Sequence, residues 1–157
     1  DPHIKLLFDF GNMVNANENP IDALTIMSPY ISQVHMKGVK KIKLKKGYEQ
    51  IGVPEGKGDL PQIRMLFTLL LLGKSEPQVK FYALEQEVGY ISPPYRFKSE
   101  NKNPIIPKRK QSFTNIDKNK SVKESLMLEK QNASNQVQYV RSLLKQMETI
   151  SKLITNE

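Results

Sequence analysis

The chain has 157 residues, which is enough for one domain of ordinary size. It contains no cysteine, which excludes disulfides and thiolate metal sites, and we expect a cytoplasmic protein. The formal net charge of +8 invites an anionic partner such as nucleic acid. The lysines crowd into Lys37–Lys46 and Lys108–Lys110, however, where we expect solvated loops, so we do not expect nucleic acid as the partner. The longest apolar run, Met65–Leu72, is far shorter than the ~20 residues that span a bilayer, so we expect no membrane partner.

The first predicted strand lies near residues 4–10 and ends close to Asp9. A helix is predicted next, near residues 20–28. Asn19 can cap this helix, and Pro20 suits its first position because proline has no N–H to satisfy there. The N-terminal part of the chain is therefore expected to be a strand followed by a helix.

The second predicted strand lies near residues 31–36 and carries His35 at its end. A helix is predicted near residues 60–72, because Asp59 and Gln62 have the spacing of a capping box. The helical periodicity predicts a buried stripe of five residues, which are Ile63, Leu66, Phe67, Leu70 and Leu71.

The third predicted strand lies near residues 79–87 and carries Glu85 and Glu87. A helix is predicted near residues 133–154, and its expected apolar face is Val137, Val140, Leu143, Leu144, Met147 and Ile150. Between them, a loop rich in proline and lysine is expected at about residues 92–131, with at most a short helix near 121–130.

Strands that alternate with helices predict an α/β fold with a parallel sheet, whose carboxyl ends meet at one edge. Asp9, His35 and Glu85 would then form a mixed oxygen and nitrogen set suited to Mn²⁺, Mg²⁺, Zn²⁺ or Fe²⁺. Taken singly, these residues also have ordinary explanations. Asp9 could be a turn residue, His35 a core histidine, and Glu85 a partner of outer lysines.

Four short motifs together resemble the sugar phosphate isomerase/epimerase family. They are FDFGN (8–12), VHMKG (34–38), VPEGKGDLPQI (53–63) and ALEQE (83–87). This family of xylose-isomerase-like TIM barrels includes D-tagatose and D-psicose 3-epimerases and hydroxypyruvate isomerase. The resemblance implies that residues 1–157 form the C-terminal part of a (β/α)8 TIM barrel, with three βα units at about strands 6–8.

The resemblance also implies a metal site formed by Asp9, His35 and Glu85. Mn²⁺ is the expected ion, with Mg²⁺, Co²⁺ or Zn²⁺ as alternatives. Glu85 would also act as a catalytic acid or base. The family's first glutamate ligand would lie upstream of Asp1, so the isolated chain would lack one of four ligands.

Three residues are candidates for substrate binding: Asn12, Lys37 and Lys41. Lys41 occupies a position where some epimerases of the family have arginine, and the family's HxKD motif reads HMKG here. The implied function in carbohydrate metabolism is a metal-dependent isomerase or epimerase that transfers a proton through an enediolate. The expected partners are a sugar or sugar phosphate, the missing N-terminal half of the barrel, and a second copy in a homo-oligomer.

Two other functions remain open from the sequence. An apurinic-site endonuclease would suit the positive charge, but the chain has only two histidines and no DRH-like motif. A truncated barrel that has no catalytic activity is the other alternative.

Overall fold

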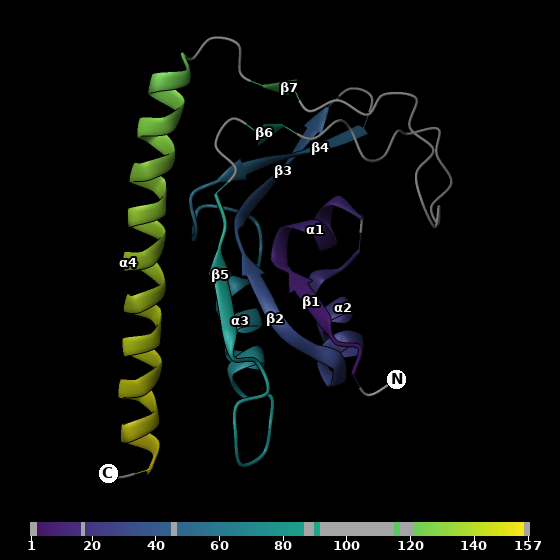
Figure 1. The fold of residues 1–157 in the computed structure, drawn as a ribbon, viewed down its shortest axis with the longest axis vertical. Coiled ribbons are helices and arrows are strands. Elements are labelled where there is room, and N and C mark those ends of the chain that lie inside the picture. Colours follow the sequence, from purple (N-terminus) through teal and green to yellow (C-terminus); the bar gives the residue numbers. More distant parts are fainter. Residues whose placement is uncertain are drawn as a thin grey trace.

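The computed structural model describes residues 3–16, 18–44, 47–86, 90–91, 115–116 and 121–155. This part of the chain forms a small α/β domain, which contains a parallel sheet, an antiparallel sheet and a long C-terminal helix (Figure 1). The two sheets lie one above the other in the view of Figure 1, and the long helix runs beside them.

The parallel sheet has three strands in the order β1-β2-β5. Their bounds are β1 (Leu6–Asp9), β2 (Ile31–Met36) and β5 (Phe81–Leu84), so the three predicted strands are present. Asp9 pairs with His35, and His35 pairs with Ala83. This register aligns the carboxyl ends of the three strands, because parallel neighbours point the same way.

The antiparallel sheet has the order β3-β4-β6-β7. Its strands are β3 (Gly38–Leu44), β4 (Gly47–Val53), β6 (Tyr90–Ile91) and β7 (Asn115–Ile116). The prediction that Lys37–Lys46 forms a loop is therefore wrong, since most of this run is β3. Val39 is buried there while its neighbour Lys40 is exposed, as expected for a strand with one solvated face.

The prediction of a C-terminal TIM-barrel fragment with three βα units is wrong. Such a fragment would carry a helix directly after each strand. Instead, β2 leads into the β3–β4 hairpin, which belongs to a second sheet. Helix α3 (Gln62–Leu70) follows only after this hairpin. The strand and helix signals did not predict the hairpin, because its lysine-rich sequence was assigned to a solvated loop.

Two of the helix starts were predicted from capping patterns. Asn19 caps α2 (Pro20–Met27) as predicted, because its side chain accepts the N–H groups of Ile21 and Asp22. Helix α3 instead begins after Pro61 with no side-chain cap. Asp59, the predicted cap, accepts the backbone N–H of Lys41 at 2.8 Å. The prediction of a capping box at this helix is thus wrong, because Asp59 accepts a hydrogen bond from the hairpin instead.

The core lies between the parallel sheet and its helices. It contains Phe8, Phe10, Leu24, Ile31, Val34, Met36, Met65, Leu66, Leu69, Val79 and Leu143. The buried face of α3 is Gln62, Met65, Leu66 and Leu69, whereas Ile63, Phe67, Leu70 and Leu71 are exposed. The predicted stripe was therefore rotated by about one residue, because the buried residues follow the expected helical spacing from Gln62 and not from Ile63.

The C-terminal helix α4 (Val122–Thr155) is a single helix of 34 residues, and the short helix predicted near 121–130 is its first part. Most of the rest of the predicted loop lies outside the described residues. Leu143 is buried, whereas Leu144 and Ile150 from the predicted apolar face are exposed. None of the helices in the described part of the chain combines the length and apolar character needed to cross a membrane.

Among the described residues, no helix covers one face of the parallel sheet. Helix α3 lies behind β2 and β5 in Figure 1, and no described helix lies in front of the three strands. Leu7, Gln33 and Phe81 pair side by side on this face, and each is exposed. Side chains alternate along a strand, so Asp9 and His35 belong to the same face at its carboxyl end. The predicted ligands thus lie at the end of an accessible sheet surface.

Candidate metal centre

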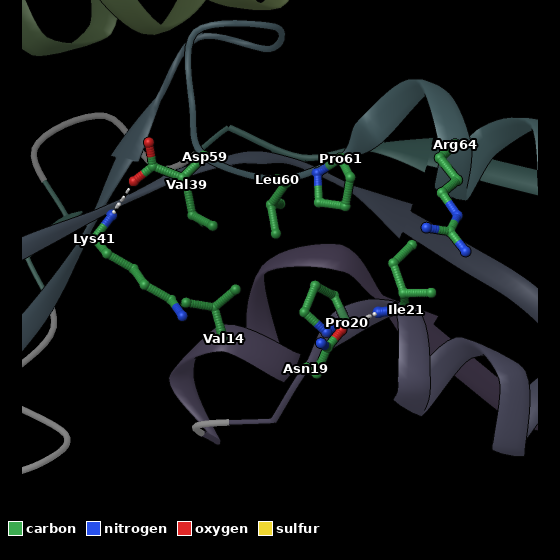
Figure 2. Close-up of a pocket in the computed structure, with 10 residues that line it drawn as sticks. All are labelled: Val14, Asn19, Pro20, Ile21, Val39, Lys41, Asp59, Leu60, Pro61 and Arg64. Atoms are coloured by element: carbon green, nitrogen blue, oxygen red, sulfur yellow. Dashed lines mark hydrogen bonds between the residues drawn. The ribbon is translucent and has the colours of Figure 1, made fainter.

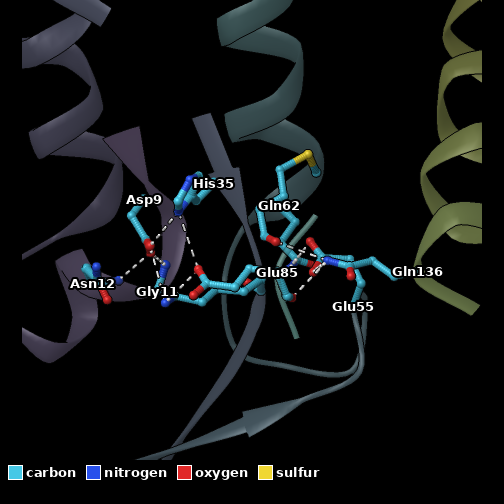
Figure 3. A network of polar contacts seen from close by, with 10 residues as sticks. Asp9, Gly11, Asn12, His35, Glu55, Gln62, Glu85 and Gln136 are labelled. Carbon is cyan, nitrogen blue, oxygen red and sulfur yellow. Dashed lines mark hydrogen bonds and ion pairs between the residues drawn. The ribbon is translucent and has the colours of Figure 1, made fainter. Parts of the chain in front are cut away.

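Asp9 ends β1 and caps α1 (Phe10–Asn15). Its Oδ1 accepts the backbone N–H groups of Gly11 and Asn12, both at 2.9 Å. The side chain is buried, and its other oxygen, Oδ2, points toward His35 (Figure 3). Because the helix start occupies Oδ1, Asp9 can offer a cation a single oxygen.

His35 and Glu85 complete the predicted set of ligands. The Nδ1 atom of His35 lies 3.8 Å from Asp9 Oδ2 and 3.5 Å from Glu85 Oε2. One ligand atom from each of the three residues lies within 4.8 Å of the other two. Glu85 follows β5, where its N–H donates to the carbonyl of Met36 at 2.9 Å. The structure therefore brings the three side chains together, and they offer two oxygens and one nitrogen (Figure 3).

Lys37 is buried between the two carboxylates. Its Nζ lies 3.2 Å from Asp9 Oδ2 and 3.1 Å from Glu85 Oε2. Gly11 makes room for this side chain, since a Cβ at Gly11 would lie 2.8 Å from Lys37 Cε. With a neutral imidazole, the four side chains carry a net charge of −1. This net negative charge favours the binding of a cation even when the Lys37 ammonium is in place.

Glu85 Oε2 is the oxygen that His35 and Lys37 both approach. It is shielded from solvent, yet it accepts no hydrogen bond of good geometry from the described residues. The ammonium of Lys37 is near enough for an ion pair but not aligned for a hydrogen bond. A buried carboxylate oxygen with this incomplete coordination could accept a metal ion.

The other predicted site residues lie apart from this cluster or only touch it. Asn12 donates its backbone N–H to Asp9, while its side chain is exposed. Lys41 lines a separate pocket of about 300 Å³, together with Val14 and Arg64 (Figure 2). Glu87, the alternative to Glu85, lies outside the described residues.

The sequence reasoning missed three buried polar residues behind the strand ends: Glu55, Gln62 and Gln136. Gln62 Nε2 donates to Glu55 Oε1 at 2.5 Å, and Gln136 Nε2 donates to Glu55 Oε2 at 3.1 Å. A signal for Gln136 was present, because this residue lies one helical turn before Val140 on the apolar stripe of α4. A polar side chain in such a stripe needs a buried partner.

Burial raises the pKa of Glu55 from 4.5 to about 7. The hydrogen bonds from Gln136 and Gln62 act in the opposite direction, because amide donors favour the carboxylate form. Tyr139 has a raised pKa for two reasons, first its own burial and then the negative charge of Glu55. The carboxyl group of Glu55 therefore changes its charge near neutral pH.

No protein-family model matches the chain. The chain is 43% identical over 153 residues to the uncharacterized protein YihM of Escherichia coli (strain K12). The match covers 98% of this chain and 47% of the relative, so the chain spans about half the length of that protein.

Proposed function

We propose that this chain carries the metal-binding residues of a divalent-metal-dependent isomerase or epimerase that acts on a sugar or sugar phosphate. The observation that carries the proposal is the convergence of Asp9, His35 and Glu85, whose ligand atoms lie within 4.8 Å of one another. Two carboxylate oxygens and one imidazole nitrogen suit Mn²⁺, with Mg²⁺, Co²⁺ and Zn²⁺ as alternatives. When bound, the ion would polarise a substrate carbonyl and favour loss of a proton from the adjacent carbon.

Residues of the chain itself would transfer the proton and stabilise the negative charge that develops. Glu85 is the carboxylate that a substrate can reach, because 38% of its side chain is exposed whereas that of Asp9 is almost entirely buried. Glu85 is therefore our candidate for moving the proton between adjacent carbons through an enediolate. Lys37 would supply a fixed positive charge beside the oxygen that becomes negative in this step.

The substrate and any further ligand form part of the same proposal. Three protein ligands leave coordination positions for substrate oxygens, which is the usual arrangement of a catalytic metal site. A fourth protein ligand, beyond the three that the described residues bring together, would come from another segment, such as the half of the relative that this chain does not match. The exposed side chain of Asn12, next to Asp9, is a candidate to contact the substrate.

Metal binding and hydrogen exchange test this proposal directly. Isothermal titration with Mn²⁺ should show one site in the wild-type chain, and this site should be lost in Glu85→Gln and in Asp9→Asn. Incubation of the loaded chain with ketoses and ketose phosphates in D₂O should introduce deuterium at carbons next to the carbonyl, detected by NMR. Lys57→Gln, a change in an exposed lysine outside the cluster, should leave both readouts unchanged.

Four results would contradict the proposal. If the wild-type chain takes up no Mn²⁺, Zn²⁺ or Mg²⁺, or if uptake is unaffected in both variants, the three side chains do not form a metal site. Cleavage of abasic-site DNA without any ketose exchange would favour the endonuclease alternative. Metal binding without either activity would favour a fragment that binds metal but does not catalyse a reaction.

A further inference from the structure

Glu55, Gln62 and Gln136 form a buried cluster that we call the Glu55 cluster. Their exposed fractions are 5%, 4% and 1%, so solvent cannot satisfy their polar atoms. They come from different parts of the chain, since Glu55 follows β4, Gln62 begins α3 and Gln136 lies in the middle of α4. Figure 3 shows the cluster beside Glu85, on the side away from Asp9.

The amide of Gln136 reaches the ends of two ligand-bearing strands. Its Nε2 lies 3.0 Å from the carbonyl oxygen of Met36 and 3.3 Å from that of Glu85. Met36 stands between His35 and Lys37 in the chain. This one amide therefore contacts the backbone at or next to three of the four site residues, and Asp9 is the exception. An amide nitrogen has two hydrogens, and here they are shared among these two carbonyls and Glu55.

Glu55 and Gln62 hold this amide in place. The Glu55 carboxyl accepts from both glutamines. Gln62 Nε2 also donates to the carbonyl of Lys37 at 3.2 Å, and its Oε1 accepts the N–H of Gly56 at 2.8 Å. The backbone carbonyls of Met36, Lys37 and Glu85 are therefore all hydrogen bonded to side chains of α3 or α4.

We propose that Gln136 is a positioning residue for the metal site, and that metal binding is coupled to the docking of α4. This inference rests on the proposed function. The directions of the His35, Lys37 and Glu85 side chains follow from the backbone that carries them. The Gln136 amide holds that backbone through its hydrogen bonds to the carbonyls of Met36 and Glu85. If α4 docks best on the strand ends that hold a metal, then the metal must in turn stabilise the docked helix, because coupling is reciprocal.

The strength of the effect follows from what the amide satisfies. If Gln136 is replaced by an apolar residue, the carbonyl of Met36 keeps the N–H of Glu85, but the carbonyl of Glu85 and Oε2 of Glu55 lose the amide donor. A buried acceptor that loses a donor costs free energy, so the strand ends would shift or admit water. Residues that orient metal ligands from outside the coordination shell typically change metal affinity by about 10-fold to 100-fold. We expect the lower end of this range, because Gln136 acts through the backbone.

The experiment compares Gln136→Leu with Gln138→Leu in the full chain. Both changes replace glutamine by leucine on α4, but Gln138 is exposed. We expect Gln136→Leu to weaken Mn²⁺ binding by about 10-fold, and Gln138→Leu to leave it within about 2-fold. In the wild-type chain, Mg²⁺ or Mn²⁺ should also slow hydrogen–deuterium exchange of α4 around residues 132–143, and Gln136→Leu should remove this effect. A residue that only stabilises the fold would not make α4 respond to a metal ion.

Equal Mn²⁺ affinity in folded Gln136→Leu and Gln138→Leu, or metal-independent exchange in α4, would overturn the inference. If Gln136→Leu does not fold, Glu55→Gln removes the charge that anchors the amide with little change in size, and the same comparisons apply. If the wild-type chain binds no metal, the proposed function fails. The positioning role is then decided by the imidazole NMR signals of His35 in metal-free protein, which should move in Gln136→Leu and not in Gln138→Leu.

Discussion

At the scale of single residues, Asp9 performs two tasks with its two oxygens. Oδ1 caps α1 by accepting two backbone N–H groups, and Oδ2 faces His35 and Lys37. The cap needs only an acceptor, whereas a metal ligand also benefits from negative charge. The two tasks can therefore be separated by substitution.

Asp9→Asn should keep the cap on α1, but it should lose the ion pair with the buried Lys37 and most of the metal affinity. Asp9→Ala should lose the cap as well, which costs about 1 kcal/mol more in the free energy of unfolding. Urea denaturation measures the stability, and titration with Mn²⁺ measures the affinity. Equal stability of the two variants would show that the cap seen at Gly11 and Asn12 contributes nothing measurable.

Glu55 makes the stability of the fold depend on pH. Its pKa is about 7 in the folded chain, whereas its ordinary value, which applies to the unfolded chain, is 4.5. As the pH rises, the unfolded chain therefore loses this proton before the folded chain does. The folded state binds more protons between these values, and stability therefore falls as the pH increases from about 4.5 to about 7. The contribution of Glu55 to this loss is on the order of 3 kcal/mol.

Glu55→Gln should remove this contribution, because the amide keeps the size of the side chain and does not titrate. Denaturation at a series of pH values from 4.5 to 8 should show a flatter profile for the variant than for the wild type. The same slope in both proteins would mean that Glu55 is not the group responsible.

At the scale of helices and strands, packing decided which face of each helix is buried. On α4, Leu143 belongs to the core, whereas Leu144 is 40% exposed although it lies next in the chain. The amphipathic pattern allowed both residues on the buried face, and the packing of α4 against the core, where this helix contacts β5, selected one. The same selection took place on α3, where Leu66 is buried and Phe67 is not.

Leu143→Ala should destabilise the chain by about 2–5 kcal/mol, because it removes a buried side chain and leaves a cavity. Leu144→Ala, with the same chemical change on the same helix, should cost less than about 1 kcal/mol. Thermal or chemical unfolding of the pair measures the difference. Similar losses in both variants would indicate that α4 does not dock on the sheet as the structure shows.

At the scale of the whole molecule, the candidate metal centre joins segments that are far apart in the chain. Asp9, His35 and Glu85 end or follow three parallel strands, and Gln136 reaches them from the C-terminal helix. A ligand that holds these segments together stabilises the folded chain only, since the unfolded chain has no such arrangement.

Mn²⁺ at 100 times its dissociation constant should therefore raise the free energy of unfolding by about 2.7 kcal/mol. Differential scanning calorimetry with and without the ion measures the corresponding rise in melting temperature. Asp9→Asn provides the control, because it should show no rise at the same concentration. A rise of equal size in this variant would assign the effect to binding elsewhere on the chain.

The sequence by itself determined the local features of this protein. Apolar runs that end in Asp9, His35 and Glu85 predicted three strands, and Asn19 with Pro20 predicted the start of α2. These features depend on contacts within a few residues, such as a cap or the alternation of a strand, and are therefore visible in a short stretch of sequence.

Only the tertiary structure decided the rest. It placed the β3–β4 hairpin where a loop was expected, and it buried Lys37 between two carboxylates. It also connected Gln136 to Met36 and Glu55 across 100 and 81 positions of the chain. The physical reason is that the burial of a charge or an amide depends on partners which the fold brings in from distant segments, and a local pattern does not specify those partners.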